Sequence, residues 1–112
     1  MQARLTYAIK FVNDMDKAVA WHRDVLGLSL RFASPGWSEF DTGATTLALH
    51  GASDKNPAGS VELGYTVRDL PGVYAARGTN GFEFLTAPAD LHGSLLATIR
   101  DSEGAQCSLS GE

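Results

Sequence analysis

The sequence lacks the patterns that mark several classes of protein. It has a single cysteine, Cys107, so no intramolecular disulfide is available and we expect a reducing, cytoplasmic environment. It has no cluster of Lys and Arg, and its formal net charge is −4, which argues against a nucleic-acid partner. No apolar run approaches the ~20 residues of a membrane span, and the first residues lack the apolar segment of a signal peptide. A Gly-rich nucleotide fingerprint is also missing.

The feature that is present is a weak internal repeat. Tyr7–Met15 recurs as Glu62–Leu70, and each copy reads as a strand that ends in Val and leads through Asp into a helix. Asp41–Leu49 matches Asp101–Leu109 in the same way. We therefore predict an α+β fold in one domain, with two β-α-β-β-β modules whose curved mixed sheets form a cleft. Module one covers residues 1–50, a polar linker covers 51–59 and module two covers 60–112.

In module one the pattern predicts a strand at 5–12, a helix at 16–26 and strands at 28–33, 37–41 and 45–50. Asp14 is a suitable N-cap for the helix, and Gly27 a suitable stop. Residues at helical spacing form one apolar face that we expect to be buried. That face comprises Met15, Ala18, Val19, His22, Val25 and Leu26, with Trp21 packed in the core at its flank.

In module two the same order of elements is expected. A strand at 60–67 leads to a helix that Asp69 caps and that ends at Gly78. Further strands are expected at 82–87, 95–100 and 105–109, with a loop at 88–93. Cys107 alternates with Ser108, so we expect its side chain on the helix side of the sheet, buried.

Three blocks of the sequence carry a family resemblance. Val12–Leu28, which contains Ala-Trp-His-Arg-Asp-Val-Leu-Gly, resembles the signature stretch of the vicinal oxygen chelate superfamily, and Trp37–Gly43 and Asp101–Gly104 resemble further blocks of that group. The superfamily includes glyoxalase I, bleomycin-resistance proteins, extradiol dioxygenases, fosfomycin-resistance enzymes and methylmalonyl-CoA epimerase. The resemblance implies the fold, but it does not specify the reaction.

The resemblance also implies four metal-ligand positions, which fall on Tyr7, Ala48, Glu62 and Ser108. Only Glu62 is a strong ligand, because a neutral phenol and a hydroxyl compete poorly with water for divalent cations. His50 lies two residues beyond Ala48 on the same strand face, so a register slip would bring it into the site. Even so, two strong ligands make a poor site. We expect no divalent metal and no other cofactor.

The same strand faces are expected to line a cup that binds a small molecule. Aromatic side chains would stack on the ligand, and Glu62 or Glu39 would offset a positive charge on it. The predicted ligand-binding residues are Tyr7, Phe11, Phe32, Trp37, Glu39, Ala48, His50, Glu62 and Ser108.

The leading hypothesis is a non-catalytic binder that resembles the bleomycin-resistance branch and sequesters an aromatic, in some cases cationic, drug or metabolite. One alternative is a glyoxalase-, dioxygenase- or epimerase-like enzyme that uses Glu62 and His50 with a metal. A second is a metal-free enzyme with Glu62 as base and Tyr7 as acid. A third is an interaction module.

Because 112 residues leave sheet edges and an apolar flank uncovered, we also expect a C2 homodimer.

Overall fold

The computed structural model describes residues 1–91 and 93–111, which divide into two compact units. The N-terminal unit is Thr6–Glu62, and the C-terminal unit combines Met1–Leu5 with the chain from Leu63 onward. Each unit has the predicted β-α-β-β-β order, with one extra short strand in the second. In the part of the chain that the structure describes, no helix is long and apolar enough to cross a membrane.

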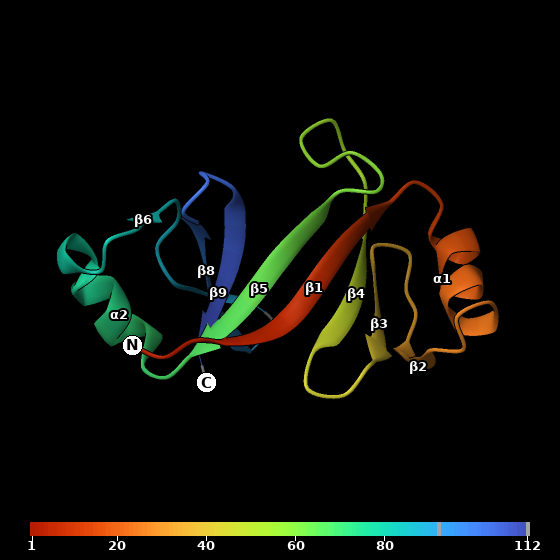
Figure 1. Cartoon of the computed structure of the whole chain (residues 1–112), viewed down its shortest axis with the longest axis horizontal. Helices are drawn as coiled ribbons and strands as arrows, with labels where there is room; N and C mark the ends of the chain where they lie inside the picture. The colour runs from red at the N-terminus through yellow and green to blue at the C-terminus, as the bar shows by residue number, and fades with distance from the viewer. Residues whose placement is uncertain (92, 112) are drawn as a thin grey trace. The chain divides into compact units, whose positions relative to one another are not determined.

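In the N-terminal unit, four strands form a mixed sheet with one helix beside it (Figure 1). The strand order is β2-β3-β4-β1, in which β1 and β4 run parallel and the other neighbours run antiparallel. The elements are β1 (Arg4–Val12), α1 (Met15–Asp24), β2 (Ser29–Phe32), β3 (Trp37–Asp41) and β4 (Thr46–Gly51). The loop after β4 belongs to this unit, because Ala52 and Gly59 hydrogen-bond to the backbone of β1.

Helix α1 begins one residue before the predicted start at 16 and ends two residues before the predicted end at 26. The Asp14 carboxylate accepts a hydrogen bond from the Lys17 backbone N–H at 3.1 Å, which satisfies an otherwise unpaired donor of the first turn. Gly27 ends the segment with a φ of 71°, a conformation that glycine adopts without a steric cost. The helix packs Val19 and His22 toward the sheet, where Phe40 is fully buried. His22 is thus a buried core histidine, as predicted.

The predicted burial is wrong for three apolar residues near the end of α1. Val25 and Leu26 are 66% and 53% exposed, because the helix ends at Asp24 and the helical spacing no longer applies beyond it. Trp21 is 47% exposed rather than packed in the core, and its ring contacts that of His22 edge-on. These side chains form an apolar patch, which we call the α1 patch, on the outside of the N-terminal unit.

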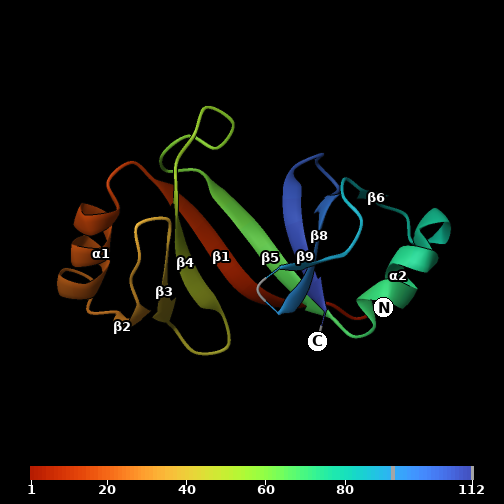
Figure 2. The same ribbon diagram turned by 180° about the vertical axis from the view of Figure 1, so that it is seen from behind.

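The C-terminal unit also has a mixed sheet beside a short helix (Figure 2). Its strands follow the order β5-β9-β8-β6, and β7 pairs with β8. Strands β5 and β9 are parallel, and the other pairs are antiparallel. The elements are β5 (Val61–Val67), α2 (Leu70–Ala75), the 3-10 turn η1 (Arg77–Thr79), β6 (Glu83–Phe84), β7 (Ala89–Leu91), β8 (Ser94–Arg100) and β9 (Gln106–Gly111).

Three predictions for this unit are wrong in detail. The predicted strand at 82–87 shortens to β6, because the N–H groups of Leu85 and Thr86 both point to the Thr98 carbonyl and interrupt the regular pairing. The predicted loop at 88–93 contains β7, which pairs with the start of β8. The expected helix to Gly78 splits into α2 and η1, and the Asp69 carboxylate caps it as predicted.

The core of the C-terminal unit lies between its sheet and α2. Cys107 is 2% exposed there, which confirms the predicted burial of the thiol. The buried members of this core are Val67, Leu70, Ala97, Ile99, Cys107 and Leu109.

Candidate functional site

One face of the N-terminal sheet collects most of the predicted ligand-binding residues in rows across three strands. The strand register places Phe11, His50 and Trp37 side by side from β1, β4 and β3. The next row is Ile9, Ala48 and Glu39, followed by Tyr7, Thr46 and Asp41. Side chains in register on one face are neighbours in a sheet. We call this surface the aromatic face.

The rings of the aromatic face touch one another. The ring centroids of Trp37 and His50 are 5.8 Å apart, those of Phe11 and His50 are 5.3 Å apart, and both pairs meet edge-on. Tyr7 joins them with its centroid 6.4 Å from that of Trp37. Edge-to-face pairs at these distances are favourable arrangements of aromatic quadrupoles. Phe11 and Ala48 form the buried floor, Tyr7 and Trp37 are half-buried, and His50 is exposed.

The hydrogen bond of His50 defines its tautomer when the ring is neutral. Its Nδ1 lies 2.8 Å from the carbonyl oxygen of Gly51. Because a carbonyl oxygen only accepts, the proton resides on Nδ1 and the lone pair on Nε2. His50 therefore offers an acceptor nitrogen on an exposed ring in the middle of the row, between Phe11 and Trp37.

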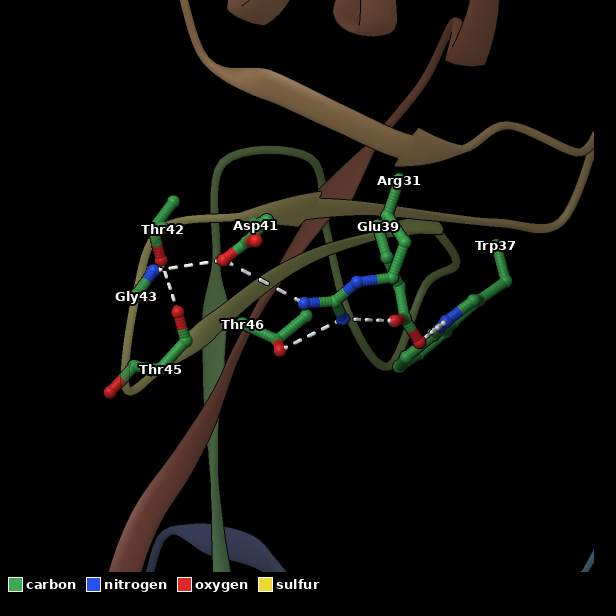
Figure 3. Close-up of polar contacts among 8 residues, drawn as sticks. All are labelled: Arg31, Trp37, Glu39, Asp41, Thr42, Gly43, Thr45 and Thr46. Carbon is green, nitrogen blue, oxygen red and sulfur yellow. Dashed lines mark hydrogen bonds and ion pairs between the residues drawn. The ribbon is translucent and has the colours of Figure 1, made fainter.

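Glu39 is held by two donors within the aromatic face (Figure 3). The Arg31 guanidinium donates to its Oε1 at 2.9 Å, and the Trp37 indole N–H donates to its Oε2 at 2.8 Å. The side chain of Glu39 is only 12% exposed. Because the Arg31 guanidinium already offsets its charge and little of the side chain is exposed, the geometry does not favour the charge-pairing role that the sequence suggested for Glu39.

Arg31 is the residue of this site that the sequence reasoning missed. It also donates to the Thr46 hydroxyl at 3.1 Å and lies 3.8 Å from the Asp41 carboxylate, so it joins three strands (Figure 3). An irregularity between Leu30 and Phe32 leaves Arg31 without a cross-strand partner. A signal was available, since alternation from the core residue Leu30 places Arg31 on the opposite face of β2.

The environment of Tyr7 stabilises its neutral form. Burial raises the pKa of Tyr7 above its ordinary value, the Glu39 carboxylate raises it further, and Arg31 partly offsets both. The phenol therefore stays protonated at neutral pH, as a hydrogen-bond donor. The pKa of Tyr7 is raised in the folded state alone. Ionisation of this phenol therefore lowers the free energy of unfolding only as pH rises above 10.0, the ordinary value of its pKa.

The Arg31→Gln variant is expected to raise the pKa of Tyr7, because it removes a positive charge and leaves that of Glu39 uncompensated. Phenolate absorbance, followed from neutral to alkaline pH, measures the effect after subtraction of the Tyr7→Phe background. Arg23→Gln is the control, because Arg23 pairs only with its neighbour Asp24 among the described residues. A Tyr7 pKa that falls or stays constant in Arg31→Gln contradicts the charge network.

Three predicted site residues lie outside the cluster of rings. Phe32 lies opposite Glu39 on β2 but is 45% exposed and makes no ring contact among the residues that the structure describes. Glu62 is partly buried at the end of the N-terminal unit. Ser108 belongs to the C-terminal unit, where it pairs with Gly64 and Thr98.

The donor atoms of this site do not fit the divalent metal that the family resemblance implies. Of the corresponding positions, Ala48 has no donor atom and is fully buried, and Tyr7 is a neutral phenol. Over residues 1–91 and 93–111, no three side chains of His, Cys, Asp or Glu come close enough together to hold a metal ion. We therefore derive no chemistry through a metal.

Comparisons with known proteins agree with this architecture. Residues 4–108 match the model of the Glyoxalase/Bleomycin resistance protein/Dioxygenase superfamily. No curated protein sequence gives a significant match. Among solved structures, a hypothetical protein from Bacillus halodurans has a TM-score of 0.80 at 14% identity, with 100% of this chain and 96% of that chain covered.

Two further structures have the same fold. Methylmalonyl-CoA epimerase from Mycobacterium tuberculosis has a TM-score of 0.74 at 20% identity, covering 96% of this chain and 86% of that chain. A superfamily member from Vibrio splendidus has a TM-score of 0.72 at 12% identity, covering 99% and 100%. With the family model matched over nearly the whole chain and the fold shared, the protein belongs to the glyoxalase/bleomycin resistance/dioxygenase superfamily, the vicinal oxygen chelate group.

Proposed function

We propose that the aromatic face binds a small, flat aromatic molecule without a metal and without converting it. The observation that carries this proposal is the set of ring contacts among Tyr7, Phe11, Trp37 and His50, which come from three strands and include an exposed imidazole. Stacking on such rings is selective for planar ligands. Like the bleomycin-resistance proteins that its sequence resembles, the protein would act by sequestering its ligand, in the cytoplasm.

The charges of the face define how the ligand is held. Arg31 and Glu39 compensate each other, so we expect ring stacking to supply most of the affinity. Asp41 is 59% exposed at the edge of the network and offers a weak, solvent-screened attraction for a cation. His50 Nε2 adds one acceptor for a ligand N–H or O–H.

Tryptophan fluorescence in the Trp21→Phe variant tests this proposal, because Trp37 is then the only tryptophan. Three flat probes of different charge are titrated: proflavine as the cation, 2-naphthoate as the anion and 2-naphthalenemethanol as the neutral compound. We expect saturable quenching by at least one probe, unchanged by EDTA, with the probe recovered intact by mass spectrometry. If none of the three probes quenches the Trp37 fluorescence saturably, the proposal is contradicted.

A metal-free proton-transfer enzyme is the second candidate. The observation in its favour is a half-buried Tyr7 phenol that stays protonated at neutral pH, so that it would donate a hydrogen bond to a ligand carbonyl while Glu62 serves as base. Such an enzyme would convert its ligand in the presence of EDTA and lose that activity in Glu62→Gln. The binder, in contrast, returns its ligand unchanged.

We further propose a homodimer in which the α1 patch is covered. Trp21, Val25 and Leu26 are all about half exposed or more on the outside of the N-terminal unit, and contiguous apolar surface of this kind marks interfaces. The double variant Trp21→Lys/Val25→Lys is expected to be monomeric in analytical ultracentrifugation, where the unmodified protein is dimeric. A dimer that survives both substitutions places the interface elsewhere, and a monomeric unmodified protein contradicts the proposal.

A further inference from the structure

A second site is suggested by a hollow in the C-terminal unit, whose lining shares no residue with the aromatic face. It has a volume of about 320 Å³ and is lined by residues of α2, η1 and β6 and by the chain that follows β6. This volume lies at the lower end of the range for small-molecule sites, which suits a single-ring ligand. The hollow is lined by Tyr74, Arg77, Gly78 and the segment 82–87.

The walls of this hollow are aromatic and hold one another in place. Tyr74 meets Phe84 edge-on with ring centroids 5.0 Å apart, and Phe82 lies 5.5 Å from Phe84. Phe82 and Phe84 also pack against the core of the C-terminal unit. A ring cluster anchored in this way offers a preformed apolar surface to a planar ligand.

Arg77 supplies the polar group of the hollow. Its guanidinium carbon lies 4.2 Å from the centroid of the Tyr74 ring, and its NH1 donates to the Tyr74 carbonyl at 2.9 Å. This bond uses one of five guanidinium N–H donors. Among the residues that the structure describes, no carboxylate lies within ion-pair distance of Arg77. The remaining donors are therefore available beside an aromatic wall.

The other charged residue of the lining does not cancel Arg77. The Glu83 carboxylate lies 3.8 Å from the Arg100 guanidinium, which also donates to the Gly104 carbonyl at 2.9 Å. Arg100 is thus engaged and Glu83 is partly compensated, whereas Arg77 is not. The hollow therefore presents the uncompensated Arg77 guanidinium to an anionic ligand, beside a Glu83 carboxylate that Arg100 partly offsets.

We propose that this hollow binds a single-ring aromatic carboxylate. The ring would lie against Phe82 and Phe84, and the carboxylate would accept hydrogen bonds from the free donors of Arg77, whose fork matches carboxylate geometry. The proposal concerns a different unit and a different ligand chemistry from the aromatic face, so either one stands or falls without the other.

Chemical-shift mapping of the ¹⁵N-labelled full chain with benzoate tests this assignment. We expect saturable shifts at the backbone amides of Gly78 and residues 82–86. Arg77→Gln is expected to weaken binding about tenfold or more, as is replacement of benzoate by uncharged benzyl alcohol, because each removes the charged hydrogen bonds. Arg23→Gln, which removes an exposed arginine from α1, is the matched control and leaves the affinity unchanged.

Two results would overturn the proposal. One is benzoate affinity that stays the same in Arg77→Gln or is matched by benzyl alcohol, since both would mean that Arg77 holds no carboxylate. The other is benzoate shifts that centre on Arg31 and the Trp37 indole, since the acid would then bind at the aromatic face. Arg77 is exposed, so its substitution leaves the core intact, and the benzyl alcohol comparison needs no variant at all.

Discussion

Replacing Trp37 with alanine is expected to weaken binding of a flat aromatic ligand about tenfold or more, which corresponds to at least 1.4 kcal/mol. Trp37 is the centre of the aromatic face, because its ring contacts those of both Tyr7 and His50 and its indole N–H holds Glu39. The variant removes the largest stacking surface and one donor to a nearly buried carboxylate. Calorimetric titration with whichever probe binds the unmodified protein measures the loss.

Two variants show whether stacking is the cause of the loss. Trp21→Ala removes the other tryptophan, which lies on α1, and is expected to leave affinity unchanged. Trp37→Phe retains a ring but cannot donate to Glu39, so it should recover most of the affinity if stacking dominates. If Trp37→Ala binds the ligand with the same affinity as the unmodified protein, the ligand does not bind at the aromatic face.

Replacing Phe40 with alanine is expected to lower the free energy of unfolding by about 3–5 kcal/mol. Phe40 is fully buried between α1 and the sheet, where it packs with Val19 and Leu49 and lies 5.8 Å from the His22 ring. Alanine leaves a cavity in the layer that supports β3, which carries Trp37 and Glu39 on its other face. Urea unfolding followed by circular dichroism measures the change.

The matched control is Phe32→Ala on the adjacent strand. Its ring is 45% exposed, so the same chemical change is expected to cost about 0.5 kcal/mol or less. Where Phe40→Ala is too unstable to measure, Phe40→Leu, with a cost of about 1.5 kcal/mol or less, gives the same ranking. Equal losses for Phe32→Ala and Phe40→Ala would show that the core of the N-terminal unit is placed incorrectly.

The sequence predicted the repeated order of elements because its signals are local. Asp14 and Asp69 cap their helices through their own side chains, and Gly27, three residues after the end of α1, has a positive φ that excludes a continued helix. Alternation within β1 and β4 also placed Tyr7, Phe11, Ala48 and His50 on one face, as the register shows. Period-two patterning is sufficient for this, since it depends on neither partner strands nor loops.

The polar partners of the site could not be predicted in the same way, because they depend on cross-strand geometry. The role of Arg31 follows from its reach across β3 to Thr46 on β4, and the bulge that frees it is not visible in a single strand. The bonds from Arg31 and Trp37 to the Glu39 carboxylate likewise join residues of different spacing on two strands, which alternation within one strand does not reveal. Trp21 and Val25 were predicted to be buried but are exposed, because helical spacing does not reveal where α1 ends or how much of its surface the sheet covers.

Elemental analysis tests the central claim, that this superfamily member has an organic-ligand surface where a metal site is implied. The untagged protein is purified without chelator and dialysed in turn against Mn²⁺, Ni²⁺, Zn²⁺ and Fe²⁺. Because the residues at the implied ligand positions include Ala48 and the neutral Tyr7, we expect substoichiometric metal in every case. One tightly held ion per chain would contradict the account and favour a metal-dependent enzyme, with His50 and Glu62 as the first ligands to substitute.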